Sequence, residues 1–158
     1  MPSDCTLVKD PACVGNQRIP LFCADQRSLA TKYCDVDLLV LRNNRIRLIV
    51  EIEESNRKPT QIAGKFLTSA LASYLIHDNH GNTAIAKDAK LVFLQVVDTT
   101  GLKVRSVKRN QWSNLERSIQ SILPLGGIRE YRLFCGDAAG FLGSSRQMID
   151  DAITQACQ

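Results

Sequence analysis

The sequence predicts a mixed α/β fold, in which helices cover the faces of one β-sheet. β-rich runs and amphipathic runs alternate along the chain in the order strand, β-hairpin, helix, strand, helix, strand, helix. With 158 residues, of which 44% are hydrophobic and 23% charged, the chain can bury one core and has little room for a second. We therefore expect a single domain that spans residues 1–158.

The N-terminal segment, residues 1–18, is expected to be irregular. Pro2, Pro11 and Gly15 discourage a long helix there, and the segment is polar. Residues 19–23 are β-rich and predict a short strand, after which a polar loop leads into the next element.

Residues 35–53 predict a β-hairpin. Aliphatic side chains dominate residues 35–41 and 46–53, and the segment between them, Arg42-Asn43-Asn44-Arg45, contains turn residues that tolerate positive φ. The two strands are therefore expected to pair antiparallel across a tight polar turn.

Three carboxylates are expected to gather at one end of this hairpin. Side chains alternate between the two faces of a strand, so Glu51 and Glu53 point the same way, and the hairpin brings Asp37 within reach of Glu51. Like charges in a half-buried cluster repel strongly unless protons or a cation neutralise them. Hard oxygen ligands suit Mg²⁺ or Mn²⁺, so the three residues are predicted metal ligands. A metal centre of this kind is typical of enzymes that hydrolyse phosphodiester bonds.

A helix is predicted over residues 59–76. Pro59 suits the first helical turn and follows residues that can cap a helix. Gln61 and Lys65 fall on one stripe near the start of the helix, close in sequence to the carboxylates. The opposite face is apolar at spacings of three and four residues, through Ile62, Phe66, Leu67, Ala70, Leu71, Tyr74 and Leu75.

The second half of the chain predicts two further strands and two helices. Residues 89–97 are continuously apolar, which is typical of a strand covered on both faces. Trp112, Leu115, Ile119 and Ile122 mark an amphipathic helix, with Trp112 in the core. A strand over residues 129–135 and a final helix, which begins at Ser144 or Ser145 and ends near Ala156, complete the order.

A basic segment precedes the helix that contains Trp112. Lys103, Arg105, Lys108 and Arg109 lie close together, and the whole chain has a formal net charge of +4. Positive groups of this kind can track a phosphate backbone, although a solvated loop or a protected strand edge would have the same composition. We predict nucleic-acid contacts for these four residues because that function agrees with the acidic cluster.

The acidic cluster resembles the signature of the PD-(D/E)XK nuclease superfamily, in which an aspartate motif precedes a strand, a Glu-x-Lys motif and a helix. Asp37 in Val36-Asp37-Leu38-Leu39 is similar to the aspartate motif, and Glu51-Ile52-Glu53 to the second motif. Asp35 shares a strand face with Asp37, but Asp37 has the family's spacing to Glu51. The resemblance implies a restriction endonuclease-like mixed β-sheet flanked by helices and a Mg²⁺-dependent activity on DNA.

The sequence departs from this family at three points. Val36 stands where proline is usual, Glu53 replaces the lysine, and no acidic helix precedes the motifs. Lys65 could supply the missing ammonium from the next helix, and Lys58 is a second candidate. Two alternatives stay open: both lysines are solvated or touch phosphate only, or Glu53 is itself a metal ligand or general base. Lys58 and Gln61 are also predicted to contact nucleic acid.

Three functions fit these patterns. The first is a metal-dependent DNA endonuclease with Asp37, Glu51, Glu53 and Lys65 as catalytic residues. The second is a catalytically inactive module with the nuclease fold that binds nucleic acid or a protein partner. The third is a structural protein in which the Glu-rich segment is a solvated strand end. A nuclease with one site per chain often cuts both strands as a homodimer, so that state is also open.

The sequence also allows predictions about the cellular location of the protein and about its cysteines and histidines. No signal-peptide pattern and no apolar run long enough to cross a membrane occur, so we expect a cytoplasmic protein without a membrane partner. The six cysteines form no CxxC pair and are expected to be free thiols, with disulfides or a zinc site as alternatives. His77 and His80 lie in a turn-rich loop and are expected to be exposed rather than metal ligands.

Overall fold

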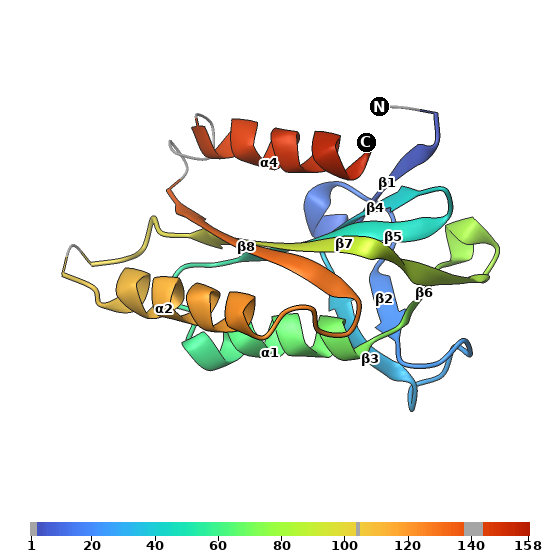
Figure 1. Ribbon diagram of the computed structural model, residues 1–158, viewed down its shortest axis with the longest axis horizontal. Coiled ribbons are helices and arrows are strands. Elements are labelled where there is room, and N and C mark those ends of the chain that lie inside the picture. The colour runs from blue at the N-terminus through green and yellow to red at the C-terminus, as the bar shows by residue number, and fades with distance from the viewer. Residues whose placement is uncertain (1–2, 104, 138–143) are drawn as a thin grey trace.

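The protein, in a computed structural model (Figure 1) that describes residues 3–103, 105–137 and 144–158, has a mixed α/β architecture. The strands are β1 (Cys5–Lys9), β2 (Ile19–Phe22), β3 (Lys32–Val36), β4 (Leu38–Arg42), β5 (Arg45–Glu53), β6 (Tyr74–Ile76), β7 (Ala84–Asp98) and β8 (Ile128–Gly136). The helices are α1 (Pro59–Leu71), α2 (Lys108–Ser121) and α4 (Ser144–Ala156), with short 3₁₀ turns η1 (Pro11–Cys13) and η2 (Asp78–His80). The predicted alternation of strands and helices is confirmed.

The eight strands form one mostly antiparallel sheet in the order β1-β4-β5-β7-β6-β2-β3, with β8 paired to β7. β7 runs parallel to both β5 and β8, and the remaining pairings are antiparallel. α4 covers one face of the sheet, and α1 and α2 cover the other (Figure 1). The prediction of helices that flank a mixed sheet is therefore correct.

Alternation along the central strands divides the core between the two faces. Toward α4, Val40, Val50 and Leu94 pack with Ala152 and Ala156. On the other face, the strand residues Leu39, Ile49 and Phe93 pack with Phe66 of α1 and Ile119 of α2. The continuous apolar run of β7 is thus covered on both sides, as expected for a central strand. Trp112 is fully buried against Ile62 and Val97, which confirms its predicted place in the core.

The predicted hairpin is formed by β4 and β5. Asn43 and Asn44 adopt φ values of 49° and 57°, the left-handed conformations that a two-residue hairpin turn requires. The expected first strand, residues 35–41, is interrupted. A bend at Asp37 assigns Asp35 to β3, which pairs with β2, while the residues after the bend pair with β5. The break lets one chain segment serve two parts of the sheet.

The prediction that residues 1–18 are irregular is wrong for residues 5–9. Cys5–Lys9 form β1, which pairs antiparallel with β4 from Cys5↔Arg42 to Lys9↔Leu38. Pro11 begins the 3₁₀ turn η1, so the absence of a long helix was correctly expected. The strand was missed because its hydrogen-bond partners lie on the edge of β4, far away in sequence.

The predicted helix over residues 59–76 is too long. α1 ends at Leu71, and Ala72 is already extended with φ −67° and ψ 150°. The backbone N–H of Ser73 donates to Phe22 O at 2.7 Å, and β6 then pairs with both β2 and β7. The apolar side chains of residues 74–76 are compatible with a helix or a strand, so the pairing with β2 and β7 decided the structure. β7 likewise begins at Ala84 rather than residue 89, because its first residues pair with β6.

Two expectations about the whole chain can be compared with the structure. All six cysteines are free, as predicted for thiols without a CxxC motif. Among the helices that the structure describes, none is long and apolar enough to cross a membrane.

Lys87 holds the C-terminal end of α1 in place. Its ammonium donates to Ser69 O at 2.8 Å, Ala70 O at 2.9 Å and Gly126 O at 2.7 Å. The first two belong to the last helical turn, whose carbonyls lack partners inside the helix. Gly126 permits the close approach, because a Cβ there would come within 1.8 Å of Ala70 O.

We expect Lys87→Met to lower the free energy of unfolding by roughly 1–3 kcal/mol, because it removes charged hydrogen bonds and leaves three carbonyl oxygens without their donor. Urea denaturation monitored by circular dichroism measures the change. Lys90→Met, on the exposed part of the same strand, is the matched control and should change stability little. Equal effects of the two substitutions would contradict this function of Lys87.

Candidate active site

Glu51 and Glu53 lie next to each other on the face of β5 that α1 covers. Their side chains are 0% and 3% exposed, so both carboxylates are withdrawn from water at the end of an apolar strand. The parallel partner β7 places Gln95 beside Glu51 and Val97 beside Glu53. The predicted orientation of the two glutamates is confirmed, and their burial is deeper than a solvated strand end would give.

Two cations reach these carboxylates from the next segment of the chain. Lys65 Nζ on α1 lies 2.9 Å from Glu51 Oε2, as the proposed return of this lysine toward the strand requires. Arg57 Nε lies 3.2 Å from Glu53 Oε2, in an ion pair without hydrogen-bond geometry. In the described part of the chain, Glu51 Oε1 and Glu53 Oε1 are buried without any hydrogen-bond partner.

Burial dominates the electrostatics of the site. It raises the pKa of Glu51 to about 8, against the lowering effect of Lys65, while Asp37 and Glu53 add like charge. Burial also raises the pKa of Glu53, although Lys65 and Arg57 oppose the shift. For Lys65, burial lowers the pKa, but the attraction of Glu51, Glu53 and Asp37 outweighs it and the net shift is upward. The ammonium therefore keeps its proton at neutral pH.

Asp37 lies in the bend between β3 and β4, beside the end of β5. Its Oδ2 accepts a hydrogen bond from the backbone N–H of Ile52 at 2.6 Å. Pairing between β4 and β5 ends at Leu38↔Val50, so this carboxylate satisfies an N–H just beyond the ladder. Asp35 lies instead in β3, where Lys32 Nζ approaches its Oδ2 to 2.7 Å. Asp37 is thus the aspartate that the fold places beside the glutamates.

The donor atoms of this site fit a hard divalent cation in their chemistry. Two buried carboxylate oxygens lack partners, and oxygen ligands are what Mg²⁺ and Mn²⁺ prefer. Across the described residues, however, no group of three His, Cys, Asp or Glu side chains is positioned to hold a metal ion. The three-carboxylate metal site of Asp37, Glu51 and Glu53 therefore stays a prediction.

Lys58 and Gln61, predicted to contact nucleic acid, lie at the exposed start of α1. Gln61 Oε1 accepts the backbone N–H of Lys58 at 2.8 Å, and the Gln61 N–H donates to Lys58 O at 2.9 Å. This reciprocal pair caps the helix. Gln61 therefore has a structural role that the sequence prediction did not include.

The basic segment lies beside the acidic site. Lys108 Nζ donates to Asn56 O at 3.3 Å and to Arg57 O at 3.1 Å, in the same loop that supplies the cation for Glu53. Arg109 Nη2 donates to Thr99 Oγ1 at 3.0 Å. Lys103 and Arg105 are exposed and, together with Lys108, line a hollow of about 380 Å³. Lys108 and Arg109 thus hydrogen-bond to neighbouring loops, and all of the four predicted basic residues except Lys108 are exposed.

Sequence reasoning missed three residues at this site: Arg57, Gln95 and Tyr131. Gln95 is fully buried, accepts a 2.8 Å hydrogen bond from the Tyr131 hydroxyl, and donates to Ile62 O at 3.3 Å. A glutamine inside the otherwise apolar run of β7 was the available signal, because a buried amide needs partners. For Arg57, the signal was its position four residues after Glu53.

Comparison with protein-family models, curated proteins and solved structures found no match to this chain. The chemistry of the site therefore has to be inferred from its own residues.

We expect the contribution of Glu51 to stability to fall as pH rises from about 4.5 to about 8, because its carboxyl binds a proton more tightly in the folded state than in the unfolded chain, where its pKa has the ordinary value of 4.5. Glu51→Gln removes this titration, so its melting temperature relative to the wild type should rise between pH 5 and pH 8.

The measurement is thermal unfolding in buffer that contains a chelator. Glu54→Gln, which changes the neighbouring but 89% exposed carboxylate, is the matched control and should not alter the pH dependence. A difference between Glu51→Gln and the wild type that stays constant with pH would contradict the raised pKa of Glu51.

Proposed function

We propose that the protein is a metal-dependent nuclease that hydrolyses phosphodiester bonds in DNA. The observation that carries this proposal is the 2.9 Å contact between Lys65 Nζ and Glu51 Oε2. It supplies an ammonium, from the helix after the Glu-x-Glu strand, at a site whose sequence lacks the lysine of the PD-(D/E)XK motif. A buried carboxylate pair with two oxygens free and two adjacent cations suits phosphoryl chemistry better than a purely structural role.

The order of the elements supports the same class of protein. Asp37 precedes β4, the antiparallel strand β5 carries Glu51 and Glu53, α1 follows at once, and β7 then runs parallel to β5. This is the arrangement of aspartate, strand, Glu-containing strand and helix that the superfamily resemblance implies. A restriction endonuclease-like topology is therefore part of the proposal.

Each site residue has a distinct chemical role in this proposal. Asp37, Glu51 and Glu53 would hold Mg²⁺ or Mn²⁺, which supplies a Lewis acid that lowers the pKa of a bound water and neutralises charge on phosphate. Lys65 keeps its proton and can stabilise negative charge on the phosphorus oxygens. Glu53, whose pKa is raised by burial, can accept a proton from the attacking water if it is not a ligand.

The proposal also covers the residues that contact DNA and the oligomeric state of the protein. Lys103 and Arg105 face solvent next to the loop that carries Arg57, so they can contact the phosphate backbone on its way to the carboxylates. With one site per chain, cleavage of both strands is most direct in a homodimer. We propose the cytoplasm as the place of action.

A second function is favoured by a different observation. Lys65 and Arg57 already pair with the two glutamates, and the described residues contain no group of three metal-ligating side chains. An inactive module with the nuclease fold, which binds nucleic acid or a protein partner without cleavage, would have this arrangement. Metal-dependent cleavage distinguishes the two functions.

We expect the wild-type protein to cleave supercoiled plasmid in the presence of Mg²⁺ or Mn²⁺, with single-stranded DNA and RNA compared in parallel. Asp37→Asn and Glu51→Gln should abolish cleavage, and Lys65→Met should reduce kcat by roughly 10²–10³, the usual effect of losing a charge-stabilising donor.

The matched control for these variants is Glu54→Gln, which neutralises an exposed carboxylate one residue after Glu53 and should retain full activity. If neither plasmid nor single strands are cut with any metal, while DNA binding is the same in all variants, the protein is an inactive module with the nuclease fold and not a nuclease.

We expect Lys103→Ala combined with Arg105→Ala to weaken DNA binding and to reduce the slope of log K against log salt by roughly 0.9 for each phosphate that the variant no longer neutralises. Fluorescence anisotropy at several salt concentrations measures both quantities. Lys90→Ala removes an exposed cation elsewhere on the surface and is the control. An unchanged slope would show that the basic segment does not contact phosphate.

A further inference from the structure

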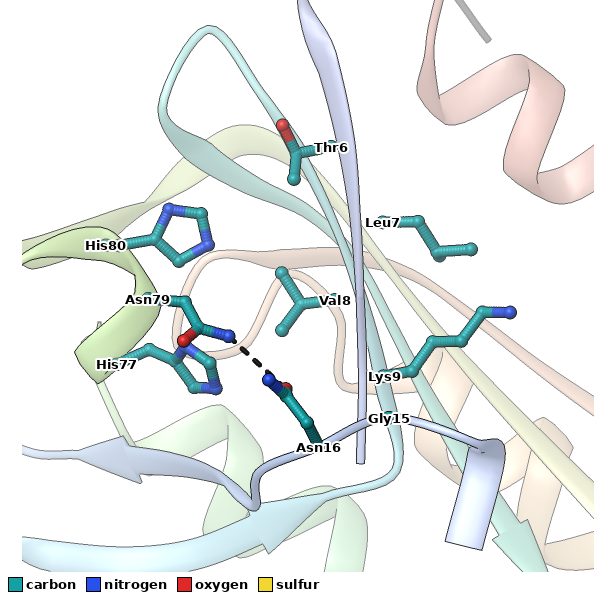
Figure 2. A pocket seen from close by; sticks show the side chains of 9 residues that line it. All are labelled: Thr6, Leu7, Val8, Lys9, Gly15, Asn16, His77, Asn79 and His80. Atoms are coloured by element: carbon teal, nitrogen blue, oxygen red, sulfur yellow. Dashed lines mark hydrogen bonds between the residues drawn. The ribbon is translucent and has the colours of Figure 1, made fainter. Parts of the chain in front are cut away.

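A second candidate site lies between β1 and the turn η2, and it contains none of the carboxylates of the acidic site (Figure 2). It is a cavity of about 410 Å³ lined by Thr6, Leu7, Val8, Lys9, Gly15, Asn16, His77, Asn79 and His80. Both histidines of the chain are therefore at one place.

His77 is the unusual residue of this cavity. The sequence predicted an exposed loop histidine, but the side chain is only 1% exposed. Nδ1 and Nε2 are both buried, and neither has a hydrogen-bond partner within the described structure. Unsatisfied buried polar atoms are costly and rare, so two on one ring require a partner from outside the chain, either water or a ligand.

The two imidazoles lie close together at the turn η2. His77 directly precedes the 3₁₀ turn η2 in an extended conformation, and His80 is the last residue of that turn. The N–H groups of His80 and Asn82 donate to His77 O at 3.0 and 3.2 Å. The ring centres lie 5.7 Å apart, with an angle of 54° between the ring planes.

The other charged groups near the cavity do not enter the space between the rings. Figure 2 shows Thr6 and Val8 on the side of β1 that faces the histidines, whereas Leu7 and Lys9 project from the opposite side. The Asp78 carboxylate is held by Arg27 and Gln17. Asn79 and Asn16 provide amide groups, joined by a hydrogen bond from Asn79 Nδ2 to Asn16 Oδ1 at 3.3 Å.

We propose that His77 and His80 bind a divalent first-row transition metal ion such as Zn²⁺, Ni²⁺ or Cu²⁺. Imidazole nitrogen suits these ions, in contrast to the hard Mg²⁺ or Mn²⁺ expected at carboxylates. With metal–nitrogen bonds of about 2.0–2.1 Å, the centres of two imidazoles on one ion lie roughly 5–6 Å apart. The observed distance of 5.7 Å between the ring centres lies within this range.

The rest of the coordination shell comes from neutral donors. The Asn79 amide oxygen and water can complete it, since the described residues offer no third His, Cys, Asp or Glu at this place. Neither ring nitrogen of His77 has a partner within the described residues, so either can bind the ion once it is deprotonated. The site does not depend on the proposed nuclease activity.

The test uses the intact, tag-free chain, whose two histidines make imidazole NMR signals easy to assign. We expect titration with Zn²⁺ to shift the signals of His77 and His80 together and to saturate at one ion per chain. His80→Gln and His77→Gln should each weaken binding at least tenfold, the lower end of the roughly 10–100-fold that outer-shell substitutions alone cause. His80 is partly exposed, so its variant tests the proposal even if His77→Gln fails to fold.

Lys9→Gln, which changes a cavity residue that points away from the rings, is the control and should bind Zn²⁺ as the wild type does. The six free thiols are competing ligands, and Co²⁺ distinguishes them because thiolate ligation gives a charge-transfer band that imidazole ligation lacks. Zn²⁺ binding that leaves both histidine signals unmoved, unchanged affinity in His80→Gln, or no binding at all would each overturn the proposal.

Discussion

The burial of two adjacent carboxylates between the sheet and α1 is the constraint on which the rest of this structure depends. Glu51 and Glu53 are almost completely withdrawn from water, and buried charges are tolerated only where protons or cations compensate them. Lys65 and Arg57 provide that compensation from the segment that follows β5. The path of the chain after β5 and the position of the first turns of α1 are therefore tied to the electrostatics of the site.

The sheet determines where these charges can gather. Pairing between β4 and β5 stops at Leu38↔Val50, so the last residues of β5 extend beyond β4 with β7 as their neighbour on one side. Asp37 satisfies the N–H that this ending exposes, and Gln95 enters from β7. A polar site thus forms where an antiparallel pairing ends and a parallel pairing continues.

Several local features were predictable because they depend on nearby residues alone. The Asn43-Asn44 turn, the shared face of Glu51 and Glu53, and the helix start at Pro59 follow from φ preferences, strand alternation and capping. The reach of Lys65 back to Glu51 was also predictable, since only a short stretch of strand, loop and helix separates the two side chains. The compensating Arg57 was missed even though it is only four residues from Glu53.

The sequence by itself determined the alternation of strands and helices, the hairpin and the grouping of acidic residues, because these patterns are short-range. Only the tertiary structure decided that Cys5–Lys9 form a strand, that Tyr74–Ile76 leave the helix, and that His77 is buried. It also made Lys108 an anchor for the loop that contains Asn56 and Arg57. In each case the deciding partner is distant in the chain, and hydrogen bonds at sheet edges and burial against other elements outweigh local preference.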